Sequence, residues 1–205
     1  MVAGSPARRS VEFFDRQFEQ QARAGAFDLN PFELLALEFA RGDLLDFGCG
    51  LGNLAVAAAR RGCRVVALDA SLHGIHSLRR RAAEEVLPID AQLADAIAYE
   101  PGQQFDTIVC IGLLMFLDCD TAEALLRRLQ AALRPGGAMI VNVLTRGTTF
   151  MDMFDPDEYC LFEPGRLNEL FSGWEIVRCD DASFPAPHET VKVFRTLVAR
   201  RPVGV

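Results

Sequence analysis

A glycine-rich turn lies between a strand-like and a helix-like apolar segment within residues 44–71, LLDFGCGLGNLAVAAARRGCRVVALDAS. The run 44–48 has the length and composition of a buried strand, whereas 53–62 is rich in alanine and has a helical pattern. A second strand-like run follows at 63–69 and ends on an acidic residue. A strand, a tight turn, a helix and a second strand in this order predict a parallel α/β sheet.

The alternation continues through the rest of the chain. Further helices are expected at 71–86, 121–137 and 164–173, and further strands at 89–95, 105–112, 138–145, 174–180 and 191–201. Only loop-like sequence separates the last two strands, which predicts an antiparallel pair at one edge. Two helices are expected before the first strand, with Ser10 as a candidate cap. We expect one domain over 1–205, with a helical cap at 1–42 and a Rossmann-like core at 43–201.

The composition disfavours several classes of function. The formal net charge of −7 and the pI near 5.0 argue against a nucleic-acid backbone as the main partner. No stretch of about 18 residues is continuously apolar, and the N-terminus lacks an apolar signal-peptide core. We therefore expect a cytoplasmic protein with no membrane contact.

The cysteines indicate neither a metal site nor a redox pair. None forms a C-x-x-C motif, and none lies at metal-ligand spacing from a histidine. The sequence therefore predicts free, mostly buried thiols in a reducing compartment and no metal. The cysteines are Cys49, Cys63, Cys110, Cys119, Cys160 and Cys179.

The glycine turn itself indicates which cofactor it holds. Gly48, Gly50 and Gly52 have the spacing G-x-G-x-G, whereas the dinucleotide fingerprint G-x-G-x-x-G would need glycine where Asn53 stands. Asp46 lies two residues before the first glycine, where a carboxylate repels a pyrophosphate but attracts a cation. S-adenosylmethionine, which carries a sulfonium and an ammonium group, fits this pattern better than NAD.

Further carboxylates lie on the next strands. Asp69 ends the second strand and is expected to accept both ribose hydroxyls of the cofactor. Asp95 ends the third strand and is expected to contact the adenine amine, with the N–H of Ala96 offered to the ring. Asp106 begins the fourth strand and is interpreted mainly as a structural residue.

Five segments resemble the motifs of class I S-adenosylmethionine-dependent methyltransferases, in that family's order: DFGCGLGN, LDAS, LADA, FDTIVCIGLLMFLD and LRPGGAMIV, within 44–143. The resemblance implies a seven-stranded sheet of order 3-2-1-4-5-7-6, with strand 7 antiparallel and helices on both faces. It also implies S-adenosyl-L-methionine as cofactor and S-adenosyl-L-homocysteine as product. The residues expected to bind this cofactor are Asp46, Gly48, Cys49, Gly50, Gly52, Asn53, Asp69, Ala70, Ser71, Asp95, Ala96 and Ile111.

The C-terminal half resembles the tellurite-resistance methyltransferases through LLMFLD, LFEPGRLNELFSGWEIV and HETVKVFRTLVARR. That family methylates soft oxyanions and thiols, and its acceptor site has a His-Arg pair before the last strand. His188 matches the histidine and is the predicted catalytic residue, but Glu189 stands where that family has arginine. This departure disfavours handling of an oxyanion as in that family.

The segment 146–165, RGTTFMDMFDPDEYCLFEPG, mixes aromatic and acidic residues. As a cover over the site, it suits a neutral, aromatic or cationic acceptor. The alternative is a surface loop that packs its aromatic side chains on the core. Phe14, Arg146 and Tyr159 are the predicted acceptor-binding residues.

The sequence thus predicts transfer of a methyl group to a small-molecule acceptor by in-line displacement. Two alternatives stay open: a non-catalytic module that binds the same cofactor, and methylation of tellurite, selenite or a thiol. A nucleotide-dependent oxidoreductase on a similar sheet is disfavoured by Asp46 and Asn53.

Overall fold

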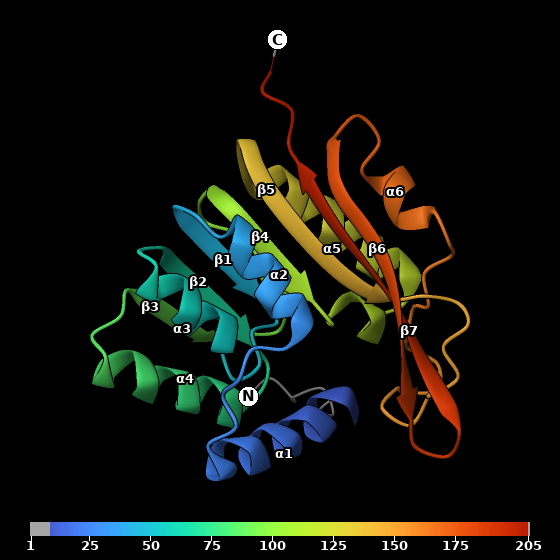
Figure 1. Ribbon diagram of the computed structural model, residues 1–205, viewed down its shortest axis with the longest axis horizontal. Helices are drawn as coiled ribbons and strands as arrows, with labels where there is room; N and C mark the ends of the chain where they lie inside the picture. The colour runs from blue at the N-terminus through green and yellow to red at the C-terminus, as the bar shows by residue number, and fades with distance from the viewer. Residues whose placement is uncertain (1–8, 205) are drawn as a thin grey trace, which may run out of the picture.

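The computed structural model describes residues 9–204 and forms a seven-stranded sheet in the order β3-β2-β1-β4-β5-β7-β6 (Figure 1). β7 is antiparallel to both of its neighbours, and the other neighbouring strands are parallel. This arrangement confirms the predicted fold class and strand order. The strands are β1 Asp43–Phe47, β2 Arg64–Asp69, β3 Ile89–Leu93, β4 Phe105–Ile111, β5 Leu133–Leu144, β6 Glu175–Ala186 and β7 Thr190–Arg200.

Helices cover both faces of the sheet (Figure 1). α2, α3 and α4 bury their apolar residues against one face, and α5 and α6 against the other. Among residues 9–204, no helix is long and apolar enough to cross a membrane. The helices are α1 Arg9–Ala24, α2 Pro31–Phe39, α3 Asn53–Arg60, α4 Leu72–Glu84, α5 Cys119–Ala132 and α6 Arg166–Leu170, with a 3-10 turn η1 at Leu114–Phe116.

The two helices that precede β1 form in different ways. The side chain of Asn30 accepts the N–H groups of Phe32 and Glu33, and the Glu33 carboxylate accepts the N–H of Asn30 at 2.8 Å. This reciprocal cap fixes the start of α2. α1 packs against α4, and Ser10 is buried within α1 rather than placed at its cap.

The β6–β7 ribbon is longer than the sequence predicts. The sequence predicts a loop at 181–190, but β6 continues almost to the turn at 187–189. Pro185 is tolerated there because β6 is an edge strand, where a missing N–H breaks no ladder. The rings of Phe184 and Phe194 lie 5.9 Å apart across the ribbon, and Phe32 contacts both. Tertiary aromatic packing therefore extends the strands through a loop-like sequence.

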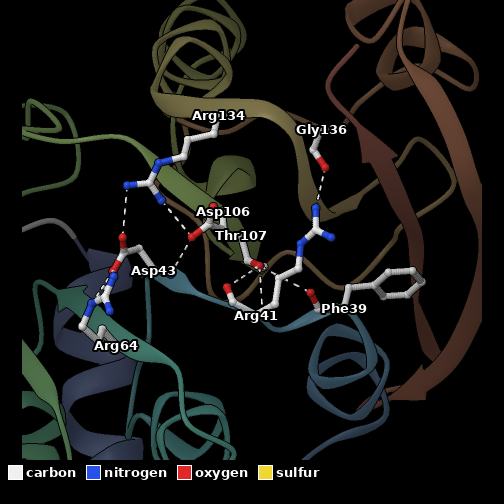
Figure 2. A network of polar contacts seen from close by, with 8 residues as sticks. All are labelled: Phe39, Arg41, Asp43, Arg64, Asp106, Thr107, Arg134 and Gly136. Atoms are coloured by element: carbon white, nitrogen blue, oxygen red, sulfur yellow. Dashed lines mark hydrogen bonds and ion pairs between the residues drawn. The ribbon is translucent and has the colours of Figure 1, made fainter. Parts of the chain in front are cut away.

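A network of polar contacts closes the amino-terminal edge of the sheet (Figure 2). Asp106 Oδ2 accepts the N–H of Asp43 at 2.9 Å and a guanidinium N–H of Arg134 at 2.8 Å, and Arg134 also reaches Asp43 Oδ2. The Thr107 hydroxyl lies 3.1 Å from the carbonyl of Arg41. The backbone hydrogen bond from Asp43, followed by the Arg134 contact, lowers the pKa of Asp106. Asp106 thus joins β1 to β4 and β5, at the edge opposite the glycine turn.

Replacing Asp106 with alanine is expected to lower the free energy of unfolding by about 1–2 kcal/mol, because two donors lose their acceptor. Urea denaturation measures this change. Glu100→Gln, which removes the charge from an exposed pair with Arg128, is the control and is expected to cost less than about 0.5 kcal/mol. Equal effects of the two substitutions would contradict a structural role for Asp106.

The prediction of six free cysteines is wrong for one pair. Cys119 and Cys160 form a disulfide that ties the start of α5 to the segment 146–165. Cys179 is exposed, whereas the other three free thiols, at Cys49, Cys63 and Cys110, are buried. The paired cysteines are 41 residues apart in sequence, so their spacing did not predict the disulfide.

Reduction of this disulfide is expected to lower the free energy of unfolding by about 2–4 kcal/mol, because the bond closes a long loop in the unfolded chain. Chemical denaturation with and without dithiothreitol measures the effect. Cys179→Ser, at the exposed free thiol, is the control and should leave the midpoint in place. A midpoint that does not move on reduction would contradict the bond's contribution.

Candidate cofactor and acceptor site

The glycine turn folds tightly between β1 and α3. The N–H groups of Gly48 and Cys49 both donate to the carbonyl of Leu68, at 2.9 and 3.0 Å. Gly52 has a φ of 69°, and a Cβ added there would lie 2.5 Å from the side chain of Leu78. Glycine is therefore required at position 52 by backbone conformation and close packing. Gly52, a predicted cofactor-binding residue, shapes the turn without lining the cavity described below.

Asp69, at the end of β2, holds the turn from the other side. Its Oδ2 accepts the N–H of Gly50 at 2.8 Å, and its Oδ1 accepts the N–H of Ser71 at 2.8 Å. Burial raises the pKa of Asp69, although these hydrogen bonds favour the charged form. Each carboxylate oxygen has a second lone pair, so both oxygens keep the capacity to accept a further donor.

Asp46, near the end of β1, is a buried acid among other acids. It is 5 % exposed, and its Oδ2 has no hydrogen-bond partner. Burial, and then the charges of Glu33 and Asp69, raise the pKa of Asp46 to about 8. An unsatisfied buried carboxyl costs folding free energy, whereas a bound cation would stabilise its charged form. The residues present therefore fit the cationic cofactor that the sequence predicts.

A cavity of about 1110 Å³ runs along the carboxyl ends of the strands. Pockets for one small ligand measure roughly 300–1,000 Å³, so this cavity has room for a cofactor and a second small molecule. Most of the predicted cofactor-binding residues meet there. The predicted residues that line it are Asp46, Gly48, Cys49, Gly50, Asn53, Asp69, Ala70, Asp95, Ala96 and Ile111.

Several other predicted site residues lie outside this lining. Ser71 caps α4, where its hydroxyl accepts the N–H of Gly74 at 2.9 Å. Arg146 is exposed and pairs with a carboxylate of its own loop, and the ring of Tyr159 packs on a neighbouring phenylalanine. Of the three predicted acceptor-binding residues, the cavity contains only Phe14.

His188 lies at the tip of the β6–β7 ribbon. It is exposed, has a φ of 59°, and does not line the cavity. The sequence places it at the mouth of the site because it precedes the last strand. Because both strands extend further than predicted, the turn that holds His188 lies beyond the residues that line the cavity. The structure therefore gives no support to the predicted catalytic role of His188.

α1 covers the cavity at the glycine turn. A Cβ added to Gly50 would lie 2.8 Å from Cζ of Phe18, so this ring packs directly on the turn. Asp15 fixes the helix in place, since its carboxylate lies 2.5 Å from the Ser71 hydroxyl and 2.6 Å from Nδ1 of His73. α1 thus lines the cavity beside the glycine turn.

Sequence reasoning missed most of the residues at the other end of the cavity. β7 contributes Lys192 and Phe194, α2 contributes Phe32, η1 contributes Phe116, and the segment 146–165 contributes Met153. Positions 192 and 194 lie on the same face of a strand, and this alternation was the sequence signal that could have placed both side chains in the cavity. The result is a chamber of aromatic and apolar side chains beside the carboxylates.

Comparison with known proteins identifies the domain. Residues 44–137 match the family model described as a methyltransferase domain. A ubiquinone biosynthesis O-methyltransferase of Xanthomonas euvesicatoria pv. vesicatoria (strain 85-10) is 33% identical over 125 residues, which cover 58% of this chain and 51% of that protein. The chain thus spans about half the length of the curated relatives it matches.

Solved structures share the fold over nearly the whole chain. TehB from Haemophilus influenzae superposes with a TM-score of 0.74 at 18% identity, covering 94% of this chain and 67% of that one. The N-methyltransferase NodS from Bradyrhizobium japonicum WM9, in complex with S-adenosyl-L-homocysteine, gives a TM-score of 0.70 at 16% identity, covering 95% and 99%. Residues 44–137 thus match a methyltransferase domain, and the described chain shares its fold with a solved methyltransferase.

Proposed function

We propose that the chain transfers a methyl group from S-adenosylmethionine to a small molecule bound in the same cavity. The observation that carries this proposal is a continuous cavity with carboxylates at one end and aromatic side chains at the other. When bound, the cofactor supplies an electrophilic methyl group, whose transfer forms a bond to the acceptor and breaks the bond to sulfur.

We assign cofactor binding to carboxylates at the carboxyl ends of three adjacent strands: Asp46 in β1, Asp69 in β2 and Asp95 just after β3. Asp46 attracts the cationic amino-acid end, and Asp69 accepts the ribose hydroxyls. Asp95 and Ala96 contact the adenine. Gly50 borders the same end of the cavity. All of these residues line the cavity, and the strands that carry or precede them are neighbours in the sheet.

The chamber beside the turn is assigned to the acceptor. Phe14, Phe116 and Phe194 line it, and half-buried or buried apolar surfaces of this kind exclude water and orient a flat or apolar molecule. Holding the acceptor in line with the transferred methyl group lowers the entropic part of the barrier. The similarity to a protein named an O-methyltransferase supports a hydroxyl oxygen as the acceptor atom.

A soft oxyanion such as tellurite is a weaker candidate for the acceptor. Among residues 9–204, the lining of the cavity contains one basic side chain, Lys192, and His188 lies outside it. A small, strongly hydrated oxyanion gains little from an apolar chamber.

Incubation with S-adenosylmethionine and a panel of phenols, amines, thiols, tellurite and selenite tests the proposal. Mass spectrometry detects S-adenosylhomocysteine and the methylated product, and Asp69→Ala is the control for background. Acceptor-dependent product from a phenol or another small organic molecule supports the proposal. Tight binding of S-adenosylhomocysteine without turnover of any acceptor would favour a non-catalytic module instead.

A further inference from the structure

Lys192 is the chain's only lysine, and it lines the acceptor end of the cavity. None of the ion pairs formed among residues 9–204 involves it. Its ammonium instead lies over the ring of Phe150, with Nζ 4.6 Å from the ring centroid. Burial lowers its pKa. A half-buried cation with an aromatic neighbour and no carboxylate partner has capacity left for an anion.

The other cations of the same ribbon behave differently. Arg195 pairs with Asp181 at 2.7 Å, and Arg178 pairs with Asp180. Arg195 lies on the opposite face of β7 from Lys192, because side chains alternate along a strand. On its own face, Lys192 is opposite Phe184 in the ladder and two residues from Phe194. The ribbon therefore keeps its internal ion pairs away from the cavity and presents one unpaired cation to it.

The surroundings of Lys192 also indicate the shape of a ligand. Phe14, Met115, Phe116, Met153 and Phe194 line the cavity together with Lys192. β1, which carries Asp46, lies three strands from β7, roughly 14 Å at ordinary strand spacing. This length accommodates an apolar or aromatic body between the cofactor and the ammonium.

The acids of the segment 146–165 do not remove this positive charge. Glu163 pairs with Arg146, and Asp155 accepts the N–H of Arg9 at 3.1 Å. Glu158 also lines the cavity, but it is exposed and lies on the loop. The sequence favours a neutral, aromatic or cationic acceptor because of these acids. Among the described residues that line the cavity, Lys192 is the one cation, and Glu158 is the one acid that this segment contributes.

We propose that the acceptor is a small organic acid with an aromatic or apolar body, and that the Lys192 ammonium binds its carboxylate. The inference rests on the proposed function, because it takes the chamber to be the acceptor site. It assigns Lys192 a role in substrate specificity: the lysine selects acids over neutral analogues and holds them with the opposite end toward the cofactor.

Matched acid and amide probes test this assignment on protein saturated with S-adenosylhomocysteine. The pairs are 4-hydroxybenzoate and 4-hydroxybenzamide, 4-hydroxyphenylacetate and its amide, and indole-3-acetate and its amide, each titrated calorimetrically. We expect the best-bound acid to bind at least about tenfold more tightly than its amide, because a hydrogen bond to a charged group usually contributes a free energy of this size. Lys192→Met should bring the acid to the level of the amide, and Lys192→Arg should keep part of the preference.

Arg178→Met is the matched control, because it removes an exposed cation from the same ribbon outside the cavity. It should leave the acid preference unchanged. Equal binding of acids and amides by the wild-type protein, or an acid preference that persists in Lys192→Met, would overturn the inference. Binding of S-adenosylhomocysteine is measured on the same samples. Its absence would overturn the proposed function, whereas its presence without an acid preference would overturn the role of Lys192 alone.

Discussion

Replacing Asp46 with asparagine is expected to weaken binding of S-adenosylhomocysteine by about 100-fold or more while stabilising the unliganded protein at pH 8. The loss of affinity follows from removing a buried carboxylate that would pair with the ligand's ammonium, an effect worth about 2–5 kcal/mol. Isothermal titration measures the affinity, and Asp90→Asn, at an exposed carboxylate on β3, is the control.

The stabilisation follows from the pKa of about 8 for Asp46. This pKa is raised above that of the unfolded chain, so the folded state holds the proton more tightly. The wild-type protein therefore loses stability as the pH rises from about 4 to 8. The amide of an asparagine side chain cannot ionise, so Asp46→Asn should remove this loss and gain on the order of 2–3 kcal/mol at pH 8.

Proton release gives a second readout for Asp46. Binding of a cation at pH 7 should release about one proton from Asp46, and this release should vanish in Asp46→Asn. Titrations in buffers of different ionisation enthalpy measure it. Equal proton release by wild type and Asp46→Asn would show that the ligand does not meet this carboxylate.

Asp69→Ala is expected to lower the affinity for S-adenosylhomocysteine by about 100-fold, but with the opposite effect on stability. Asp69 accepts the N–H groups of Gly50 and Ser71, so its removal loosens the turn as well as deleting the proposed ribose contact. We expect a loss of about 1–2 kcal/mol in the free energy of unfolding, partly offset because a buried charge is also removed.

Asp69→Asn separates these two effects, because the amide oxygen still accepts one of the two N–H groups. Asp90→Ala is the control on the neighbouring strand. We expect stability to decrease in the order Asp90→Ala, Asp69→Asn, Asp69→Ala. A variant at position 69 that binds S-adenosylhomocysteine as tightly as wild type would contradict the placement of the ribose.

The cofactor end of the cavity was predictable because its geometry is local. A strand that runs into glycine and then into a helix can fold in few ways, and Asp46 and Asp69 are fixed by their positions at the ends of adjacent parallel strands. The strand order came from the resemblance to a family, and the structure confirms it. The cofactor contacts of these residues stay a prediction.

The acceptor end depends on long-range packing that local patterns do not contain. The aromatic contacts of Phe32 with the ribbon lengthen β6 and β7, and this moves His188 away from the site while leaving Lys192 in it. β5 likewise starts at Leu133, within a segment that the sequence assigns to the end of a helix. The disulfide between Cys119 and Cys160 joins segments whose proximity only the fold creates.

Parallel calorimetric titration of the purified protein with S-adenosylmethionine, S-adenosylhomocysteine and NADH measures which cofactor the cavity binds. Both adenosyl ligands are expected to bind with one site per chain, Asp46→Asn and Asp69→Ala should weaken this binding by about 100-fold, and NADH should not bind. Binding of NADH alone, or of none of the three, would contradict the assignment of the cavity to S-adenosylmethionine.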